Sequence, residues 1–293
     1  MNGIIVIDKP PKKTSHDMVY FVRRLTGIKK VGHTGTLDPD ATGVLPICIG
    51  RATKAADMLT GADKEYETEL VLGKTTDTQD ASGKVISEQT VNVTEKEILD
   101  TVSQFIGEIT QIPPMFSAIK QDGKKLYELA RQGISVERKA RKVTVYGIDV
   151  TEIDLENNTV KLTVRCSKGT YIRTLCEDIG KKLGVGAYMN TLRRTKSAGF
   201  GLEQSHTVEE LTKMKEENKL NEAVLPLDSI FSEYDKIKLP DFLAKKVKNG
   251  VKIGYKSAEN GKKYRIYDEN GAFLCISECN NGELILKKAF WVE

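Results

Sequence analysis

The stretch Gly32-His33-Thr34-Gly35-Thr36-Leu37-Asp38-Pro39-Asp40-Ala41-Thr42-Gly43 lies between a basic, helix-like segment and the apolar run 44–49. This order predicts a loop that leads into a β-strand. The glycines and Pro39 disfavour regular structure and let the backbone approach a neighbouring group closely. A carboxylate such as Asp38 in this setting can do chemistry, or it can simply shape a turn.

The size and composition of the chain are those of an ordinary globular protein. Its 293 residues allow one large domain with a small appendage, and 39% apolar residues provide enough material for a core. The apolar run at residues 3–7 is too short for a secretion signal, and we find no segment that could cross a membrane. We therefore expect a cytoplasmic protein.

Residues that commonly bind metals or cofactors are scattered along the chain. The five cysteines show no CxxC spacing and the three histidines are far apart, which argues against a zinc site or a disulfide framework. The segment 73–75 ends like a phosphate-binding loop, but Thr68 stands where the first glycine is needed. At 184–186 a dinucleotide fingerprint fails because Met189 occupies the third glycine position. We expect chemistry without a metal or an organic cofactor.

Positive charge is concentrated in two segments. Residues 236–293 carry twelve Lys and Arg against seven Asp and Glu, and residues 119–142 carry eight against three, so each has a net charge of +5 while the whole chain has only +4. Such segments are typical of surfaces that contact a polyanion such as nucleic acid, although basic runs are also found on merely solvated faces.

Apolar periodicity and capping residues predict alternating strands and helices. Ser15, Thr94, Thr170 and Thr207 are the expected helix N-caps, and the polar segment 73–84 is expected to be a surface loop. Strands are expected at 3–8, 44–49, 64–72, 143–153, 160–166 and 187–200, and helices at 15–26, 51–59, 170–184 and from residues 94 and 207.

Two segments depart from this alternation. Residues 111–142 combine an extended stretch, a short helix at 123–133 and a basic run, and we interpret them as an insertion that folds over a substrate or as a purely structural subdomain. From about residue 236, one helix and short strands separated by Asn-Gly turns predict a compact, basic, β-rich module.

Arg173 stands in the first turn of the helix expected at 170–184. A cation is unfavourable there because it opposes the helix dipole. The position therefore suggests a partner carboxylate or phosphate whose attraction exceeds that cost.

Several of these residues resemble the motifs of the bacterial TruB-type tRNA pseudouridine-55 synthases. The similar stretches, in the family's order, are Asp8-Lys9-Pro10, Gly32 to Gly50, Tyr66 within 64–73, Ser167-Lys168-Gly169-Thr170-Tyr171-Ile172-Arg173-Thr174-Leu175 and Leu192-Arg193-Arg194. The resemblance implies an α+β fold. Residues 1–230 would form a pseudouridine synthase catalytic domain with a mixed, largely antiparallel sheet, flanking helices and a thumb-like insertion at about 111–142. Residues 236–293 would form a small β-rich, PUA-like RNA-binding domain.

The resemblance also implies a reaction and a set of site residues. The reaction would convert uridine 55 in the T-arm loop of tRNA to pseudouridine without a cofactor, by a monomer that needs no protein partner. Asp38 matches the catalytic aspartate, Arg173 the arginine that pairs with it and keeps it ionised, and Tyr66 the tyrosine that stacks on the base and takes part in proton transfer. The residues expected to line the pocket or contact RNA are His33, Tyr171, Leu192, Asp80 and Lys9.

The chemistry agrees with this set of residues. Changing an N-glycoside into a C-glycoside requires uracil to be detached, turned and rejoined, and a carboxylate that attacks or assists proton removal keeps the pieces in one dry pocket. Which of these Asp38 does is left open. The alternatives are an RNA-binding protein without activity and a relative that works inside a guide-RNA particle; the segment 111–142 favours the stand-alone enzyme.

Overall fold

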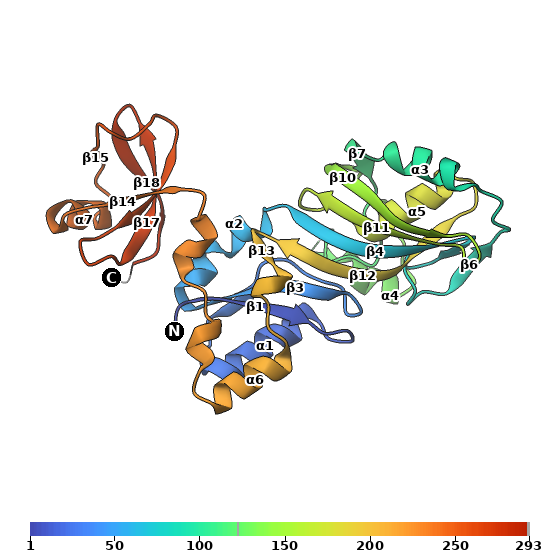
Figure 1. Cartoon of the computed structure of the whole chain (residues 1–293), viewed down its shortest axis with the longest axis horizontal. Coiled ribbons are helices and arrows are strands. Elements are labelled where there is room, and N and C mark those ends of the chain that lie inside the picture. Colours follow the sequence, from blue (N-terminus) through green and yellow to red (C-terminus); the bar gives the residue numbers. More distant parts are fainter. Residues whose placement is uncertain (122, 292–293) are drawn as a thin grey trace.

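The computed structural model describes residues 1–121 and 123–291. Asp122, within the expected insertion, and Val292 and Glu293, at the end of the expected C-terminal domain, lie outside the described residues. Figure 1 shows a large sheet with helices packed on it and, at the other end of the molecule, a smaller sheet formed by the last part of the chain.

The large sheet follows the order β1-β3-β12-β4-β11-β10-β7, with β2 paired to β3 and β13 to β12. Among the described residues its pairings are antiparallel except the short contact between β3 and β12. This confirms the expected α+β fold. The strands are β1 (Gly3–Lys9), β2 (Val31–His33), β3 (Thr42–Ile49), β4 (Lys64–Leu72), β7 (Gly107–Gln111), β10 (Arg141–Asp154), β11 (Thr159–Cys166), β12 (Ala187–Ser197) and β13 (Phe200–Gly201).

Helices and small hairpins surround this sheet. The α-helices of the larger part are α1 (Ser15–Thr26), α2 (Ala56–Thr60), α3 (Glu95–Ser103), α4 (Leu126–Arg131), α5 (Ile172–Lys182) and α6 (Val208–Glu216). The hairpins are β5 (Lys74–Thr76) with β6 (Val85–Glu88), and β8 (Lys120–Gln121) with β9 (Lys124–Lys125). No helix in the described part of the chain is long and apolar enough to cross a membrane.

The apolar core explains why β1 is apolar without interruption whereas β4 alternates between buried and more exposed residues. On β1, Ile5 and Ile7 join the main apolar cluster, whereas Ile4 and Val6 pack in a second cluster on the other face. Burial on both faces requires an uninterrupted apolar run, as found at residues 4–7. On β4 the buried and more exposed residues alternate, as expected for a strand with one covered face.

The structure corrects two of the four expected helix caps. The N-cap of α1 is Thr14 rather than Ser15, and Thr14 forms a capping box with Asp17. Thr170 does not cap α5, because the chain becomes helical only after Tyr171. The capping boxes at Thr94 and Thr207 are confirmed.

The segment 73–84 is more ordered than a surface loop. It contains β5, and its turn is fixed to the large sheet by the backbone pairing of Asp80 with Met189. Thr76 within it is buried. The expectation of a surface loop holds for residues 77–84, whereas residues 74–76 form β5 and Asp80 pairs with β12, a long-range pairing that is not visible in the local sequence.

The smaller part of the chain has its own sheet and its own apolar cluster. Its sheet follows the order β14-β16-β17-β18-β15, and its helix α7 begins after Pro240. We propose two domains, residues 1–230 and 236–293, on this basis. The elements are β14 (Asp235–Lys238), α7 (Asp241–Lys248), β15 (Ile253–Gly254), β16 (Lys263–Tyr267), β17 (Phe273–Asn280) and β18 (Glu283–Ala289).

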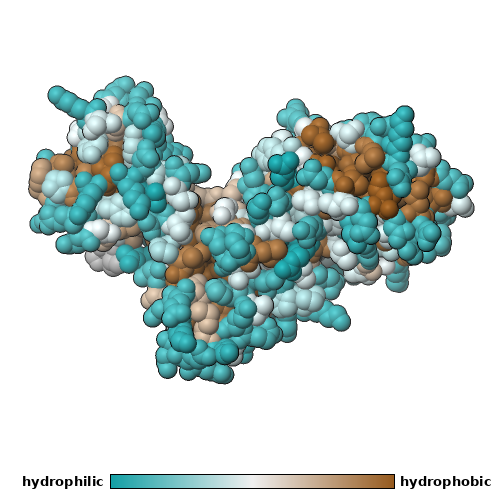
Figure 2. Space-filling model, in the orientation of Figure 1, coloured by the Kyte–Doolittle hydropathy of each residue, from teal (hydrophilic) through white to brown (hydrophobic). Residues whose placement is uncertain are grey.

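The two parts of the chain meet at a small apolar cluster, which contains Ala55, Phe231, Ile276 and Phe290. Phe231 and Phe290 pack together with their ring centroids 5.7 Å apart, and the Arg51 guanidinium donates to the Phe290 carbonyl at 3.1 Å. Figure 2 shows that the visible surface of the smaller part is mainly hydrophilic, whereas apolar side chains gather where α3 and β10 lie. Among the exposed apolar residues, Leu99 belongs to α3 and Leu155 directly follows β10.

Gly43, where β3 meets β12, allows a direct test of the packing. Its φ is +99°, and a Cβ there would lie 2.2 Å from the Arg194 carbonyl oxygen. We expect Gly43→Ala to lower the free energy of unfolding by about 3 kcal/mol or more, measured by denaturant unfolding. Gly27→Ala is the control, because Gly27 has a similar positive φ of +73° with nothing within 4 Å, and it should cost only about 1 kcal/mol. If both variants lost the same free energy of unfolding, the contact between β3 and β12 would not be tight.

Candidate active site

The loop that carries Asp38 is held by side chains from three other elements. Ser15, in the first turn of α1, accepts a hydrogen bond from the Leu37 backbone N–H at 2.8 Å. Arg194, on β12 and fully buried, donates to the Gly35 carbonyl at 3.2 Å and to the Val44 carbonyl at 2.7 Å. The backbone on both sides of Asp38 is therefore fixed by the larger fold.

Lys9 is the third anchor, and its position corrects the expectation that it contacts RNA. Its side chain is fully buried, and its ammonium group donates to the carbonyls of Pro10, Lys13 and Pro39 at 2.7–2.9 Å. Because Pro39 directly follows Asp38, the hydrogen bond from Lys9 fixes the Asp38 loop to the end of β1. Burial lowers the pKa of Lys9 to about 8, although the carboxylates of Asp40 and Asp38 raise it.

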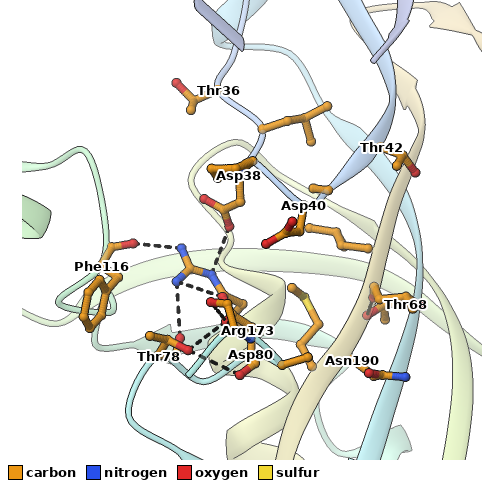
Figure 3. A pocket seen from close by; sticks show the side chains of 18 of the residues that line it. Thr36, Asp38, Asp40, Thr42, Thr68, Thr78, Asp80, Phe116, Arg173 and Asn190 are labelled. Carbon is orange, nitrogen blue, oxygen red and sulfur yellow. Dashed lines mark hydrogen bonds and ion pairs between the residues drawn. The ribbon is translucent and has the colours of Figure 1, made fainter. Parts of the chain in front are cut away.

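Arg173 connects Asp38 to two other segments, as Figure 3 shows. Its Nε atom lies 3.0 Å from Oδ2 of Asp38, and its Nη1 atom lies 3.5 Å from Oδ2 of Asp80. The same guanidinium donates to the carbonyls of Thr78 at 3.3 Å and Phe116 at 2.9 Å. One buried side chain on α5 thus joins the Asp38 loop, the segment 77–84 and the segment 111–142.

The surroundings of Asp38 make its carboxyl more basic than a free one. Although 39% of its side-chain surface remains exposed, the surrounding protein desolvates the carboxylate and this raises its pKa. The Arg173 guanidinium lowers the pKa, and the Asp80 carboxylate raises it. The net direction is upward, so Arg173 offsets only part of the desolvation.

Gln79 was missed by the sequence reasoning, and it fixes the turn that surrounds Arg173. Its φ is +66°, an unusual value for a residue other than glycine. Its side-chain amide accepts a hydrogen bond from the Thr174 hydroxyl at 2.9 Å and donates to the Glu177 carboxylate at 2.5 Å. Arg173, Thr174 and Glu177 all belong to α5, so this helix holds the turn at several points. No local signal distinguishes Gln79 from its polar neighbours.

Gln111 also organises the start of α5. Its side-chain amide accepts from the Tyr171 N–H at 3.0 Å and donates to the Tyr171 carbonyl at 3.2 Å. Gln111 therefore fixes the residue that precedes the first turn of α5, whereas the Thr170 hydroxyl donates to the Ser167 carbonyl at 3.0 Å. A contact between residues 60 positions apart cannot be seen in the sequence of the helix itself.

Asp38 and Arg173 line a large open cleft of about 1780 Å³. Its walls come from the Asp38 loop, the start of α1, the segment 77–84, the segment 111–142 and the strands β4, β11 and β12. Of the expected site residues, His33, Asp80 and Leu192 also line this cleft. Tyr66 and Tyr171 are not among its lining residues. Lys9 does not line it either, but its ammonium group donates to the Pro39 carbonyl of the Asp38 loop.

Tyr66 is almost entirely buried, in the apolar cluster that also contains Leu37 and Ala41 of the Asp38 loop. Burial raises the pKa of its phenol, whereas the charge of Arg194 and a hydrogen bond from that side chain lower it. A raised pKa means that the phenol carries its proton at neutral pH. Its expected roles in base stacking and proton transfer stay predictions.

His33 lies at the rim of the loop, where its ring nitrogen Nδ1 accepts a hydrogen bond from the Gly35 N–H at 3.3 Å. Burial lowers the pKa of its imidazole, and the charges of Arg194 and His16 lower it further. A neutral ring is well suited to stacking against a nucleobase.

In the described residues, no group of three or more His, Cys, Asp or Glu side chains is arranged to hold a metal ion. The five cysteines are all buried free thiols. Among the groups that line the cleft, the Asp38 carboxylate is the one paired with buried Arg173. A carboxylate with a raised pKa, partly neutralised by a guanidinium, can attack an electrophilic carbon or accept a proton.

Three family models match consecutive parts of the chain. The model described as the N-terminal domain of the TruB family pseudouridylate synthases matches residues 23–172. The model of the tRNA pseudouridylate synthase B C-terminal domain matches residues 173–232, and that of pseudouridine synthase II TruB, C-terminal, matches residues 236–287.

Individual proteins are similar over almost the whole chain. The tRNA pseudouridine synthase B of Clostridium perfringens (strain SM101 / Type A) is 44% identical over 294 aligned residues, which cover 98% of both chains. That of Alkaliphilus oremlandii is 50% identical over 253 residues, or 86% of this chain and 83% of the relative. Among solved structures, a chain of a Cbf5-Nop10-Gar1 complex has a TM-score of 0.74 at 28% identity, covering 99% of this chain and 85% of that one.

Lys9→Met tests whether Lys9 is an internal anchor. The substitution leaves three carbonyls without their donor, so we expect the free energy of unfolding to fall by about 2–4 kcal/mol, measured by denaturant unfolding at pH 7. Lys13→Met, which removes an exposed neighbouring ammonium, should change it by less than about 0.5 kcal/mol. Similar values for the two variants would contradict the anchoring role.

The pH dependence gives a second readout of Lys9. Because its pKa in the folded protein is about 8, against 10.5 for the ordinary side chain, the unfolded chain binds more protons between these values. The stability of the wild type relative to Lys9→Met should therefore increase as the pH rises from about 8 to 10. A constant difference over this range would show that burial does not perturb Lys9.

Proposed function

The chain belongs to the TruB family of pseudouridylate synthases, and on this premise we propose that it converts uridine 55 in the T-arm loop of tRNA to pseudouridine, with Asp38 as the catalytic carboxylate. The observation that carries the proposal is the ion pair between Asp38 and buried Arg173, 3.0 Å apart, in a cleft large enough for several nucleotides. A protein that only binds RNA needs no desolvated carboxylate of this kind.

The proposed reaction begins with the target nucleotide turned out of the RNA loop, because a stacked base cannot reach the cleft. Asp38 then acts on the uridine, either by attacking carbon or by assisting proton removal at the sugar. Arg173 keeps enough of the carboxylate ionised despite its desolvation. The bond between ribose and the uracil nitrogen breaks, the detached uracil turns in the cleft, and a bond forms between ribose and a uracil carbon. The proton on that carbon is then lost, and the freed nitrogen takes up a proton.

Other residues have proposed roles around this centre. We assign Tyr66 to contact with the target base and to proton transfer, and His33 to stacking beside the displaced nucleotides. Leu192 and Tyr171 would form apolar parts of the base pocket. Asp80 shares Arg173 with Asp38, so its contribution would include orienting the guanidinium as well as contacting RNA.

Two basic regions would hold the RNA. The thumb-like segment 111–142 contributes Phe116, Tyr127 and Arg131 to the cleft wall, and its Phe116 carbonyl accepts a hydrogen bond from Arg173. This hydrogen bond supports the interpretation that segment 111–142 folds over the substrate rather than forming a purely structural subdomain. The PUA-like domain at 236–293, with its net charge of +5, would add phosphate contacts outside the cleft.

We propose that the chain works as a monomer in the cytoplasm, where tRNA is its substrate, without an obligatory protein partner. The solved relatives of the Cbf5 type were determined in complexes that contain other chains. Segment 111–142 supplies part of the cleft wall from within this chain, which supports the stand-alone form. Formation of pseudouridine by the purified chain on a bare T-arm stem-loop would distinguish the stand-alone form from one that works inside a guide-RNA particle.

Asp38→Asn is the decisive variant for this function. We expect it to abolish pseudouridine formation in a T-arm stem-loop while its affinity for the RNA stays within about tenfold of wild type, because the amide preserves shape and removes the charge. Asp40→Asn, in the same loop but exposed, is the matched control and should keep the rate within about threefold. Pseudouridine is quantified by nucleoside mass spectrometry. Product at the wild-type rate from Asp38→Asn would overturn the assignment.

A further inference from the structure

An aromatic row leads away from the cleft along the exposed side of α1. His16 lines the cleft together with His33. One turn further along the helix, the Tyr20 ring meets the His16 ring edge to face, with 4.7 Å between their centroids. One turn beyond, the Arg23 guanidinium lies over the Tyr20 ring at 5.5 Å from its centroid. The row is therefore continuous with the cleft.

Tyr20 is held in place although it is exposed. The residue retains 53% of its accessible surface. Its ring lies between His16 and Arg23, whose guanidinium also donates to the Val31 carbonyl on β2 at 3.2 Å. The opposite side of α1 is fixed in the core by Met18, Val19, Val22 and Leu25. A rigid, solvent-facing aromatic ring is a good stacking surface because little conformational freedom is lost when a partner binds.

The charges around the row favour an anionic partner. The exposed cations near the two ends of α1 and before β2 form no ion pair with any described residue; they are Lys12, Lys13, Arg24, Lys29 and Lys30. The acidic residue of α1, Asp17, has its carboxylate engaged by the Thr14 N–H and hydroxyl at 2.8 and 2.7 Å. Aromatic rings flanked by cations are the usual surface for unpaired nucleotides, which offer both a base to stack and a phosphate to neutralise.

We propose that His16 and Tyr20 form a stacking platform for an unpaired nucleotide of the RNA, next to the nucleotide that enters the Asp38 pocket. The proposal rests on the proposed function, since it takes the occupant to be the RNA whose target base lies in the cleft. A protein partner would account for an exposed tyrosine, but not for its continuity with the cleft or for the unpaired cations around it. The platform adds affinity and orients the RNA strand, and it takes no part in the chemical step.

Substitution of Tyr20 tests the platform. Tyr20→Ala should weaken binding of the T-arm stem-loop and raise KM by about 5- to 50-fold, while kcat stays within about twofold. Tyr20→Phe, which keeps the ring, should bind within about twofold of wild type, and Tyr20→Leu, which keeps bulk without an aromatic face, should behave like Tyr20→Ala. Tyr146→Ala removes another tyrosine, which is 51% exposed and does not line the cleft. This variant should bind the stem-loop as tightly as wild type and have the same KM.

The readouts separate failure of the platform from failure of the proposed function. Affinity is measured by fluorescence anisotropy, and a fluorescent purine placed beside the target uridine should be quenched by wild type and Tyr20→Phe but much less by Tyr20→Ala. Unchanged affinity and quenching in Tyr20→Ala, with its unfolding temperature equal to that of wild type, would overturn the platform. Absence of pseudouridine with wild type would overturn the proposed reaction, whereas the binding comparison would still decide the platform.

Discussion

The guanidinium of Arg173 is the group on which the geometry of the site depends. It is buried, and it reaches Asp38, Asp80 and two backbone carbonyls from segments far apart in the chain. A buried guanidinium is costly unless all its directions are used, and here the partners lie on three sides. The same demand for partners brings the Asp38 loop, the turn at 77–84 and segment 111–142 together around one centre.

Beneath this centre, the loop is supported by buried cations that donate to carbonyls. Lys9 and Arg194 both have fully buried side chains, and each ties the Asp38 loop to a neighbouring strand or turn. Because carbonyl partners leave the positive charge unneutralised, Lys9 also lowers the pKa of the Asp38 carboxyl. The loop is thereby rigid without regular structure, and its carboxylate can be desolvated without moving away from Arg173.

Local patterns predicted most of the strands and helices, and the family resemblance predicted the fold class and the pair of Asp38 and Arg173, but neither predicted the residues that support the site. Alternation located β4 to the residue. The misplaced charge of Arg173 indicated a carboxylate or phosphate partner, and the family resemblance implied that this partner is Asp38. The sequence predicts Ser15 as the cap of α1, and only the fold shows that the adjacent Thr14 caps this helix while Ser15 holds Leu37. Lys9 lies in a recognised motif, yet a motif does not state whether a lysine faces RNA or the core. Gln79 and Gln111 act through contacts 60 or more residues away, and such contacts leave no trace in local periodicity.

The central claim is that Asp38 must be ionised for catalysis and that Arg173 sets the pH at which this happens. It is tested most directly by titrating the ¹³C-labelled Asp38 carboxyl by NMR and by measuring the single-turnover rate over the same pH range, in wild type and in Arg173→Met. We predict that the acid limb of the rate coincides with the Asp38 titration, and that both move to higher pH by about one unit or more when the guanidinium is removed. An acid limb that does not follow the Asp38 titration, or that stays in place in Arg173→Met, would contradict the claim.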